Sequence, residues 1–127
     1  MHSVARAILA IAGLLIAMGG IYDLFMPRLP LNLLAICGVN HRAQSLVREL
    51  LRALGGALTA IGIAVCAISI AAQPFPTHPQ LFLILLLVLP AEGVNTAAMH
   101  RVGSPWHFPL AFALLTLVGV ALAWASI

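Results

Sequence analysis

Four long apolar segments, separated by short stretches rich in proline and polar residues, dominate this sequence. A helix needs about 20 apolar residues to cross the roughly 30 Å hydrocarbon core of a bilayer. Because lipid offers the backbone no hydrogen-bond partners, such segments form helices or a closed barrel, and continuous apolar runs favour helices. The sequence thus predicts an all-α integral membrane bundle of four transmembrane helices, running up-down-up-down. We expect these helices at about 4–25, 41–72, 80–99 and 105–126.

The composition leaves no room for a separate soluble domain. The chain has 127 residues, of which 63% are hydrophobic and only 7% are charged, whereas a soluble domain is about 25% charged. We therefore expect one domain over 1–127, surrounded by membrane lipid. A cleaved signal peptide over 1–26 is a weaker interpretation, because no small-residue cleavage site follows the first apolar run. The six arginines are too few and too scattered for a nucleic-acid surface, so no nucleic-acid partner is expected.

Small residues mark the faces on which the first two helices are expected to pack. Helices in lipid gain nothing by burying apolar side chains, so close contacts use small residues. In the first helix, this face carries Arg6, Ala10, Gly13, Ala17 and Gly20. In the second helix, it carries Arg48, Arg52, Gly55, Thr59, Gly62, Cys66 and Ser69. A third face, with Glu49, Gly56, Ala60 and Ala67, also carries small or polar residues. Because two of its three faces are small or polar, we expect the second helix to be the central packing helix.

Turn and capping residues refine the boundaries of the helices. Residues 31–38 are too short to span the membrane and predict a short interfacial helix that is closed by Gly38, with an ordinary loop as the alternative. Asn40 is expected to cap the second long helix. Ser104 is expected to cap the fourth, with Pro105 at its first position.

The arginines also predict the orientation in the membrane. Arg28, Arg42 and Arg101 lie in the loops that follow the first and third helices, whereas only Arg6 lies near the opposite end. The positive-inside rule therefore predicts that these two loops are cytoplasmic and that both termini lie outside.

The most informative polar residue is Glu92, within the apolar stretch 85–95. An unpaired charge in this position costs at least about 2.5–3.5 kcal/mol, so the carboxyl group is expected to be protonated, paired or facing water. Arg52 enters the second helix from the same side of the membrane and is the nearest predicted partner. We predict that Glu92 and Arg52 interact directly or through one water molecule, with Asn95 in support.

Other polar residues are expected at the same level of the membrane. The predicted polar cluster comprises Glu92, Arg52, Asn95, Arg48, Glu49, Asp23 and Tyr22. One interpretation is an ion pair that locks the second helix to the third, which would leave the chain a purely structural or accessory membrane subunit. Another is a polar cavity that binds a small hydrophobic or amphipathic ligand, or a partner membrane protein. A third is proton-coupled transport of a small molecule through Glu92, and the small-residue faces leave a homo-oligomer open as well.

No motif for catalysis, a cofactor or a metal accompanies this cluster. Cys37 and Cys66 are isolated in the sequence. His41, His100 and His107 lack the spacing of a metal site. No nucleotide-binding loop and no Ser–His–Asp arrangement is indicated. We expect no cofactor and no metal, and the sequence disfavours an enzyme without deciding the question.

The second helix resembles a helix of the DoxX-like membrane proteins. In the second helix, the similarity rests on an acidic residue followed by a pair of glycines and a further glycine, namely Glu49, Gly55, Gly56 and Gly62. In the third helix, it rests on an acidic residue followed by glycine, Glu92 and Gly93. The layout of four helices with a long first loop is similar too. This resemblance implies a small multi-pass protein of the bacterial inner membrane. Some relatives are subunits of quinone-linked redox systems and others assist maturation of partner proteins, but this chain has no redox cysteine pair or cofactor motif for such chemistry.

Overall fold

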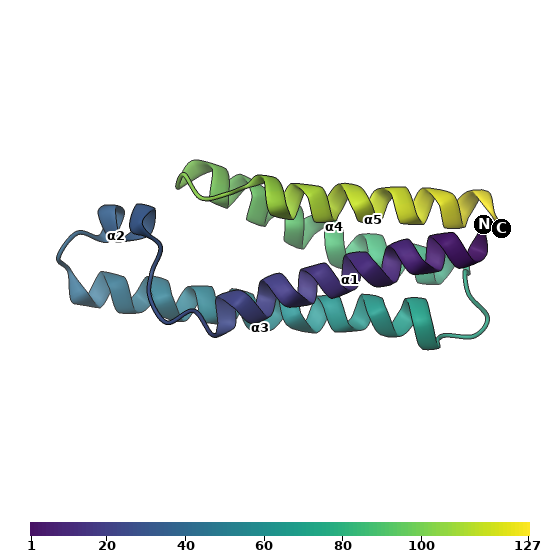
Figure 1. Cartoon of the computed structure of the whole chain (residues 1–127), viewed down its shortest axis with the longest axis horizontal. Helices are drawn as coiled ribbons and strands as arrows, with labels where there is room; N and C mark the ends of the chain where they lie inside the picture. Colours follow the sequence, from purple (N-terminus) through teal and green to yellow (C-terminus); the bar gives the residue numbers. More distant parts are fainter.

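The computed structural model describes all 127 residues and consists of five helices without a strand. The helices are α1 (His2–Leu24), α2 (Leu31–Cys37), α3 (His41–Ala71), α4 (His78–Arg101) and α5 (His107–Ala125). All except α2 are long and apolar enough to cross a membrane, and these four run alternately up and down in one bundle (Figure 1). The predicted all-α bundle is therefore confirmed, and the chain is a multi-pass membrane protein.

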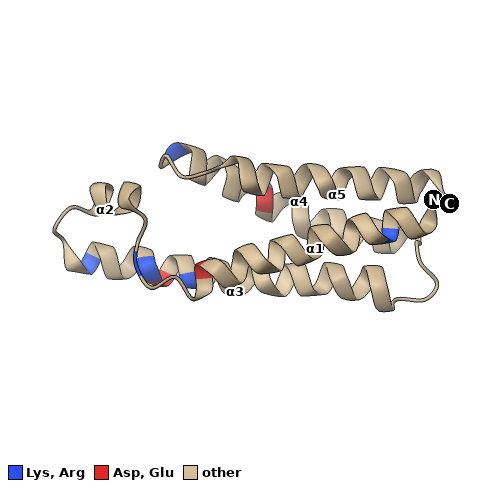
Figure 2. Cartoon of the chain, viewed as in Figure 1, with Lys and Arg blue, Asp and Glu red and all other residues tan.

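The two ends of the bundle differ in what they carry. Both termini lie at one end, the terminal end, where the loop between α3 and α4 also lies (Figure 1). The opposite end, the loop end, carries α2 and the loop between α4 and α5. All charged residues except Arg6 lie toward the loop end (Figure 2). At about 1.5 Å per residue, α3 is about 46 Å long, so it extends beyond the roughly 30 Å hydrocarbon core.

The central helix of the bundle is α1, which packs along α3 on one side and α5 on another. The remaining helix, α4, packs mainly on α5, and it makes few contacts with α3. The prediction that the helix beginning at His41 is the central one is therefore wrong. The third small face of α3 has no partner in this chain, because Ala60 and Ala67 are exposed and a Cβ atom on Gly56 would meet nothing within 4 Å.

Glycines bring the backbones of α1 and α3 into direct contact. A Cβ atom added to Gly20 would lie 2.6 Å from the carbonyl oxygen of Gly55, and one added to Gly55 would lie 2.5 Å from that of Gly20. Gly13 and Gly62 make the same kind of contact two turns nearer the terminal end. A larger residue at these positions would force the helices apart. The prediction that the small faces of the two helices point toward protein is confirmed for these glycines, whereas Arg52, on the same predicted face of α3, is exposed.

The capping predictions have mixed outcomes. The short helix α2 ends at Gly38, which has a φ of 61°, and the Asn40 side chain accepts hydrogen bonds from the backbone N–H groups of Arg42 and Ala43. Both predictions are confirmed. The predicted cap by Ser104 is wrong, because α5 begins at His107 and its N-cap is Trp106. The hydroxyl group of Ser104 instead accepts a hydrogen bond from a side chain of α2.

Candidate ligand cavity

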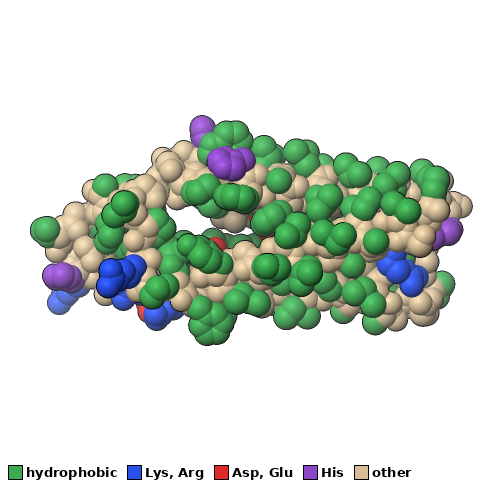
Figure 3. All heavy atoms as spheres, in the orientation of Figure 1, with side chains coloured by type: hydrophobic (Ala, Val, Ile, Leu, Met, Phe, Trp, Pro, Cys, Tyr) green, Lys and Arg blue, Asp and Glu red, His purple; other side chains and the backbone are tan.

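A cavity of about 900 Å³ lies in the loop-end half of the bundle. The pair α1 and α3 separates from the pair α4 and α5 toward this end (Figure 1), and residues of all five helices line the space between them. The space-filling view shows a hollow there with acidic side-chain atoms at its edge (Figure 3). Most lining residues are apolar, and the polar ones are Tyr22, Asp23, Asn32, Glu92, Asn95 and Ser104.

Glu92 is placed in this cavity by the periodicity of α4. The buried residues of α4 recur every three or four positions, so they form one face of the helix that points into the bundle; they are Leu81, Ile84, Val88, Glu92 and Asn95. The Glu92 side chain is only 1% exposed. Its Oε2 atom is buried and has no hydrogen-bond partner within the protein. Glu92, a lining residue of the cavity, thus holds a buried acceptor atom without a partner inside the protein.

Three other predicted cluster residues line the same cavity. Asn95 is 9% exposed and lies one helical turn after Glu92 on the same face of α4. Asp23, near the end of α1, is half-buried. Tyr22 also borders the cavity, although its side chain is 71% exposed. The structure thus brings together two carboxyl groups, an amide and a phenol from two different helices.

The remaining three predicted cluster residues lie elsewhere. The Arg52 guanidinium donates a hydrogen bond of 2.8 Å to the Glu49 carboxylate on the same helix, and both side chains are exposed. Neither residue lines the cavity. The predicted direct contact between Glu92 and Arg52 is therefore wrong. Arg52 finds its counter-charge one turn away at the surface of α3, so it has no need to reach into the bundle.

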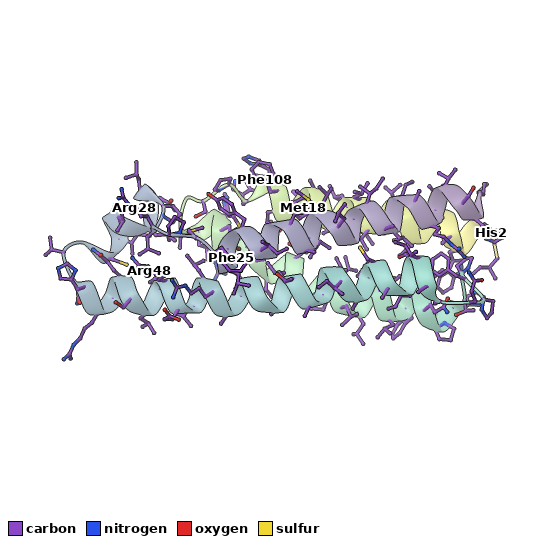
Figure 4. All side chains as sticks on the ribbon, turned by 60° about the horizontal axis from the view of Figure 1, so that its bottom comes forward. His2, Met18, Phe25, Arg28, Arg48 and Phe108 are labelled. Carbon is purple, nitrogen blue, oxygen red and sulfur yellow. The ribbon has the colours of Figure 1, made fainter.

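Arg48 also lies outside the cavity lining. It is half-buried, and its Nε atom has no hydrogen-bond partner. Figure 4 shows Arg48 and Arg28 at the loop end, far from His2 at the terminal end. The only ionisable groups that line the cavity are consequently its two carboxyl groups and the phenol of Tyr22.

Sequence reasoning missed the residues that close the loop end of the cavity. The Asn32 side-chain amide donates hydrogen bonds to the Val102 carbonyl oxygen at 3.0 Å and to the Ser104 hydroxyl at 2.8 Å. These contacts join α2 to a loop about 70 residues further along the chain, so no local pattern signals them. Phe108 and Phe112 of α5 add aromatic rings to the lining, and in sequence they are indistinguishable from lipid-facing residues.

The histidines and cysteines form no cluster of metal ligands in this structure. No group of three histidine, cysteine or acidic side chains lies close enough to hold a metal ion. His100 instead packs edge-on against Trp106, with 5.3 Å between ring centroids. Cys37 and Cys66 are unpaired. The cavity beside Glu92 is therefore the candidate functional site of this chain. Comparisons with protein-family models, curated proteins and solved structures find no match for the chain.

Proposed function

We propose that this protein binds a small amphipathic molecule from the membrane in the cavity beside Glu92. The apolar body of the ligand would lie against the leucines of α3 and the phenylalanines of α5, and its polar group would meet the Glu92 carboxyl group. A volume of about 900 Å³ falls within the range of about 300–1,000 Å³ that is typical of small-molecule sites. An apolar lining with a few converging polar groups is also typical of such sites.

The observation that carries this proposal is the unpartnered Oε2 atom of Glu92. The large majority of buried polar atoms in proteins have a hydrogen-bond partner, and leaving one without a partner costs about 1–3 kcal/mol, more for a charged group. A role of Glu92 in locking two helices together would require an internal partner such as Arg52, which is engaged with Glu49. A bound molecule that donates a hydrogen bond to Glu92 would supply the missing partner.

Proton-coupled transport through Glu92 is the second candidate, because an ionisable group within a membrane span is a candidate for function by default. Transport requires access to the carboxyl group from both sides of the membrane. Between Glu92 and the terminal end, however, the face of α4 is filled by Leu81, Ile84 and Val88, which are all 0% exposed. A binding site that is reached from one end fits this packing better than a conduit.

The cellular placement belongs to the same proposal. The arginine-rich loop end would face the cytoplasm of a bacterial cell, following the positive-inside rule. The DoxX-like resemblance supports the inner membrane as the location. Membership of that family stays a prediction, and so does assembly into a homo-oligomer or with a partner membrane protein.

Photolabelling of the purified protein in lipid nanodiscs tests ligand binding. We would use three alkyl probes of equal chain length, each with a diazirine in the chain, that end in an amine, an alcohol or a carboxylic acid. At least one probe is expected to label residues of the cavity saturably, with competition by its unlabelled analogue. Labelling that does not saturate, and that spreads evenly over the lipid-facing surface for all three probes, would contradict the proposal.

A cavity-filling variant provides the matched control. Leu54 is half-buried and lines the cavity on α3, so Leu54→Trp is expected to occupy part of the space and to abolish saturable labelling. Leu46 lies two turns earlier on the same helix and is exposed outside the cavity. Leu46→Trp should therefore label like the wild type. Equal loss of labelling in both variants would point to a general effect of tryptophan and not to a specific cavity.

A further inference from the structure

We infer that the ligand is a lipophilic organic cation, an amphipathic molecule whose polar group is an amine or a quaternary ammonium. This inference rests on the proposed function and specifies the chemical class of its ligand. The relevant observation is the sign of the charges that surround the cavity. Its lining includes the carboxyl groups of Glu92 and Asp23 and no arginine, lysine or histidine side chain.

The two carboxyl groups reach the cavity from different helices, Glu92 from α4 and Asp23 from α1. A charged group that leaves water needs an oppositely charged partner, because its desolvation is otherwise uncompensated. A bound cation would meet two acidic groups, and an ammonium group would donate the hydrogen bond that Glu92 Oε2 lacks. Hydrogen bonds between charged groups are the strong ones. A bound anion would instead meet acidic groups alone and would be repelled.

The arginines near the loop end do not make the lining of the cavity positive. Arg52 is paired with Glu49 at the surface. Arg28 is exposed, and neither it nor Arg48 lines the cavity. Arg42 and Arg101 are also exposed and outside the lining. An anionic head group at the membrane surface could meet these arginines, whereas a polar group beside Glu92 would meet no basic lining residue.

Aromatic rings add a second attraction for a cation. The rings of Tyr22, Phe108 and Phe112 belong to the lining, on α1 and α5. Cations are attracted to the faces of aromatic rings, and quaternary ammonium ligands are commonly recognised in this way. Carboxyl groups together with aromatic rings and an apolar wall thus fit an organic cation with a hydrocarbon body better than an alcohol or an acid of the same size.

Competition among the three alkyl analogues in nanodiscs tests the inference without any substitution. The unlabelled amine, alcohol and acid would each compete against the probe that labels the cavity best. We expect the amine to compete at a concentration about tenfold lower than the alcohol does, which corresponds to about 1.4 kcal/mol, because a hydrogen bond between charged groups is stronger than one from a neutral hydroxyl. The acid should be the weakest competitor.

Equal competition by amine and alcohol, or stronger competition by the acid, would overturn the inference while leaving the proposed function intact. Absence of saturable labelling with every probe would overturn the proposed function itself.

Variants that replace a carboxyl group by a carboxamide then test which residues cause the preference for amine over alcohol. Glu92→Gln removes the acid at nearly constant volume, so the preference for amine over alcohol should fall from about tenfold to about twofold or less, while the alcohol still competes. Glu49→Gln removes an exposed carboxylate outside the cavity and should retain the full preference. If Glu92→Gln does not purify as a folded protein, Asp23→Asn replaces it, with an expected partial loss of preference. A full preference for the amine in both cavity variants would overturn the assignment to these carboxyl groups.

Discussion

The Asn32 side chain of α2 and the Ser104 hydroxyl of the loop between α4 and α5 are joined by a hydrogen bond of 2.8 Å. This bond crosses the loop end of the cavity between the two helix pairs, since Asn32 and Ser104 both line the cavity. The same amide also binds the Val102 carbonyl oxygen at 3.0 Å. The Asn32 side chain therefore ties α2 to the loop between α4 and α5, while α2 also contacts α3.

Asn32→Ala removes both hydrogen bonds, each of which contributes about 0.5–1.5 kcal/mol. We expect the backbone amides of α2 to exchange hydrogen for deuterium faster in this variant, with exchange in α1 unchanged. Hydrogen–deuterium exchange with mass spectrometry measures this directly. Asn40→Ala is the control, because it removes the cap of α3 and should affect only the first turn of that helix. Unchanged exchange in α2 after Asn32→Ala would show that this side chain does not hold the helix in place.

The contact between α1 and α3 predicts opposite effects for two adjacent glycines. In Gly55→Ala, the new methyl group would lie 2.5 Å from backbone atoms of Gly20 and Leu24, so the helices must separate. Overpacking of this kind typically costs about 1–3 kcal/mol. The new methyl group of Gly56→Ala meets nothing within 4 Å, and because alanine favours a helix interior over glycine, this variant should raise the free energy of unfolding by about 0.4–1 kcal/mol. Unfolding in mixed micelles by titration with a denaturing detergent measures both, and similar values for the two variants would refute the close contact.

The pair of Arg52 and Glu49 is expected to contribute little. The two side chains are 44% and 65% exposed, and exposed pairs at this helical spacing contribute about 0.2–0.5 kcal/mol. Arg52→Gln should therefore leave the free energy of unfolding within about 0.5 kcal/mol of the wild-type value, and ligand labelling should be unaffected. A loss of several-fold in labelling would mean that Arg52 belongs to the site after all.

The number of helices and the packing of α1 on α3 could be predicted because both depend on local periodicity. A glycine every seven residues, as at Gly13 and Gly20 or at Gly55 and Gly62, identifies a face of a helix before any partner is known. The burial of Glu92 follows from the same rule, since it lies in register with Ile84 and Val88 on one face of α4.

The partner of Glu92 could not be predicted in this way. Periodicity shows which residues share a face, but it does not show how far apart two helices lie or how they are rotated. Depth in the membrane alone favours Arg52 as the partner of Glu92, whereas Glu49 lies one turn from Arg52 on the same helix and forms the ion pair. The contact of Asn32 with Ser104 joins distant parts of the chain, and the cavity exists because α3 and α4 separate toward the loop end. Neither feature leaves a local pattern in the sequence.

The central claim is that Glu92 offers its free carboxylate oxygen to a ligand inside the bundle. A crystal structure of the protein grown in a lipidic mesophase with a long-chain alkylamine tests this most directly. We expect density in the cavity, with the amine nitrogen about 3 Å from the Glu92 carboxyl group and the alkyl chain against α3 and α5. A cavity closed by side chains, with Glu92 bound to another residue of the protein and the amine absent, would contradict the account.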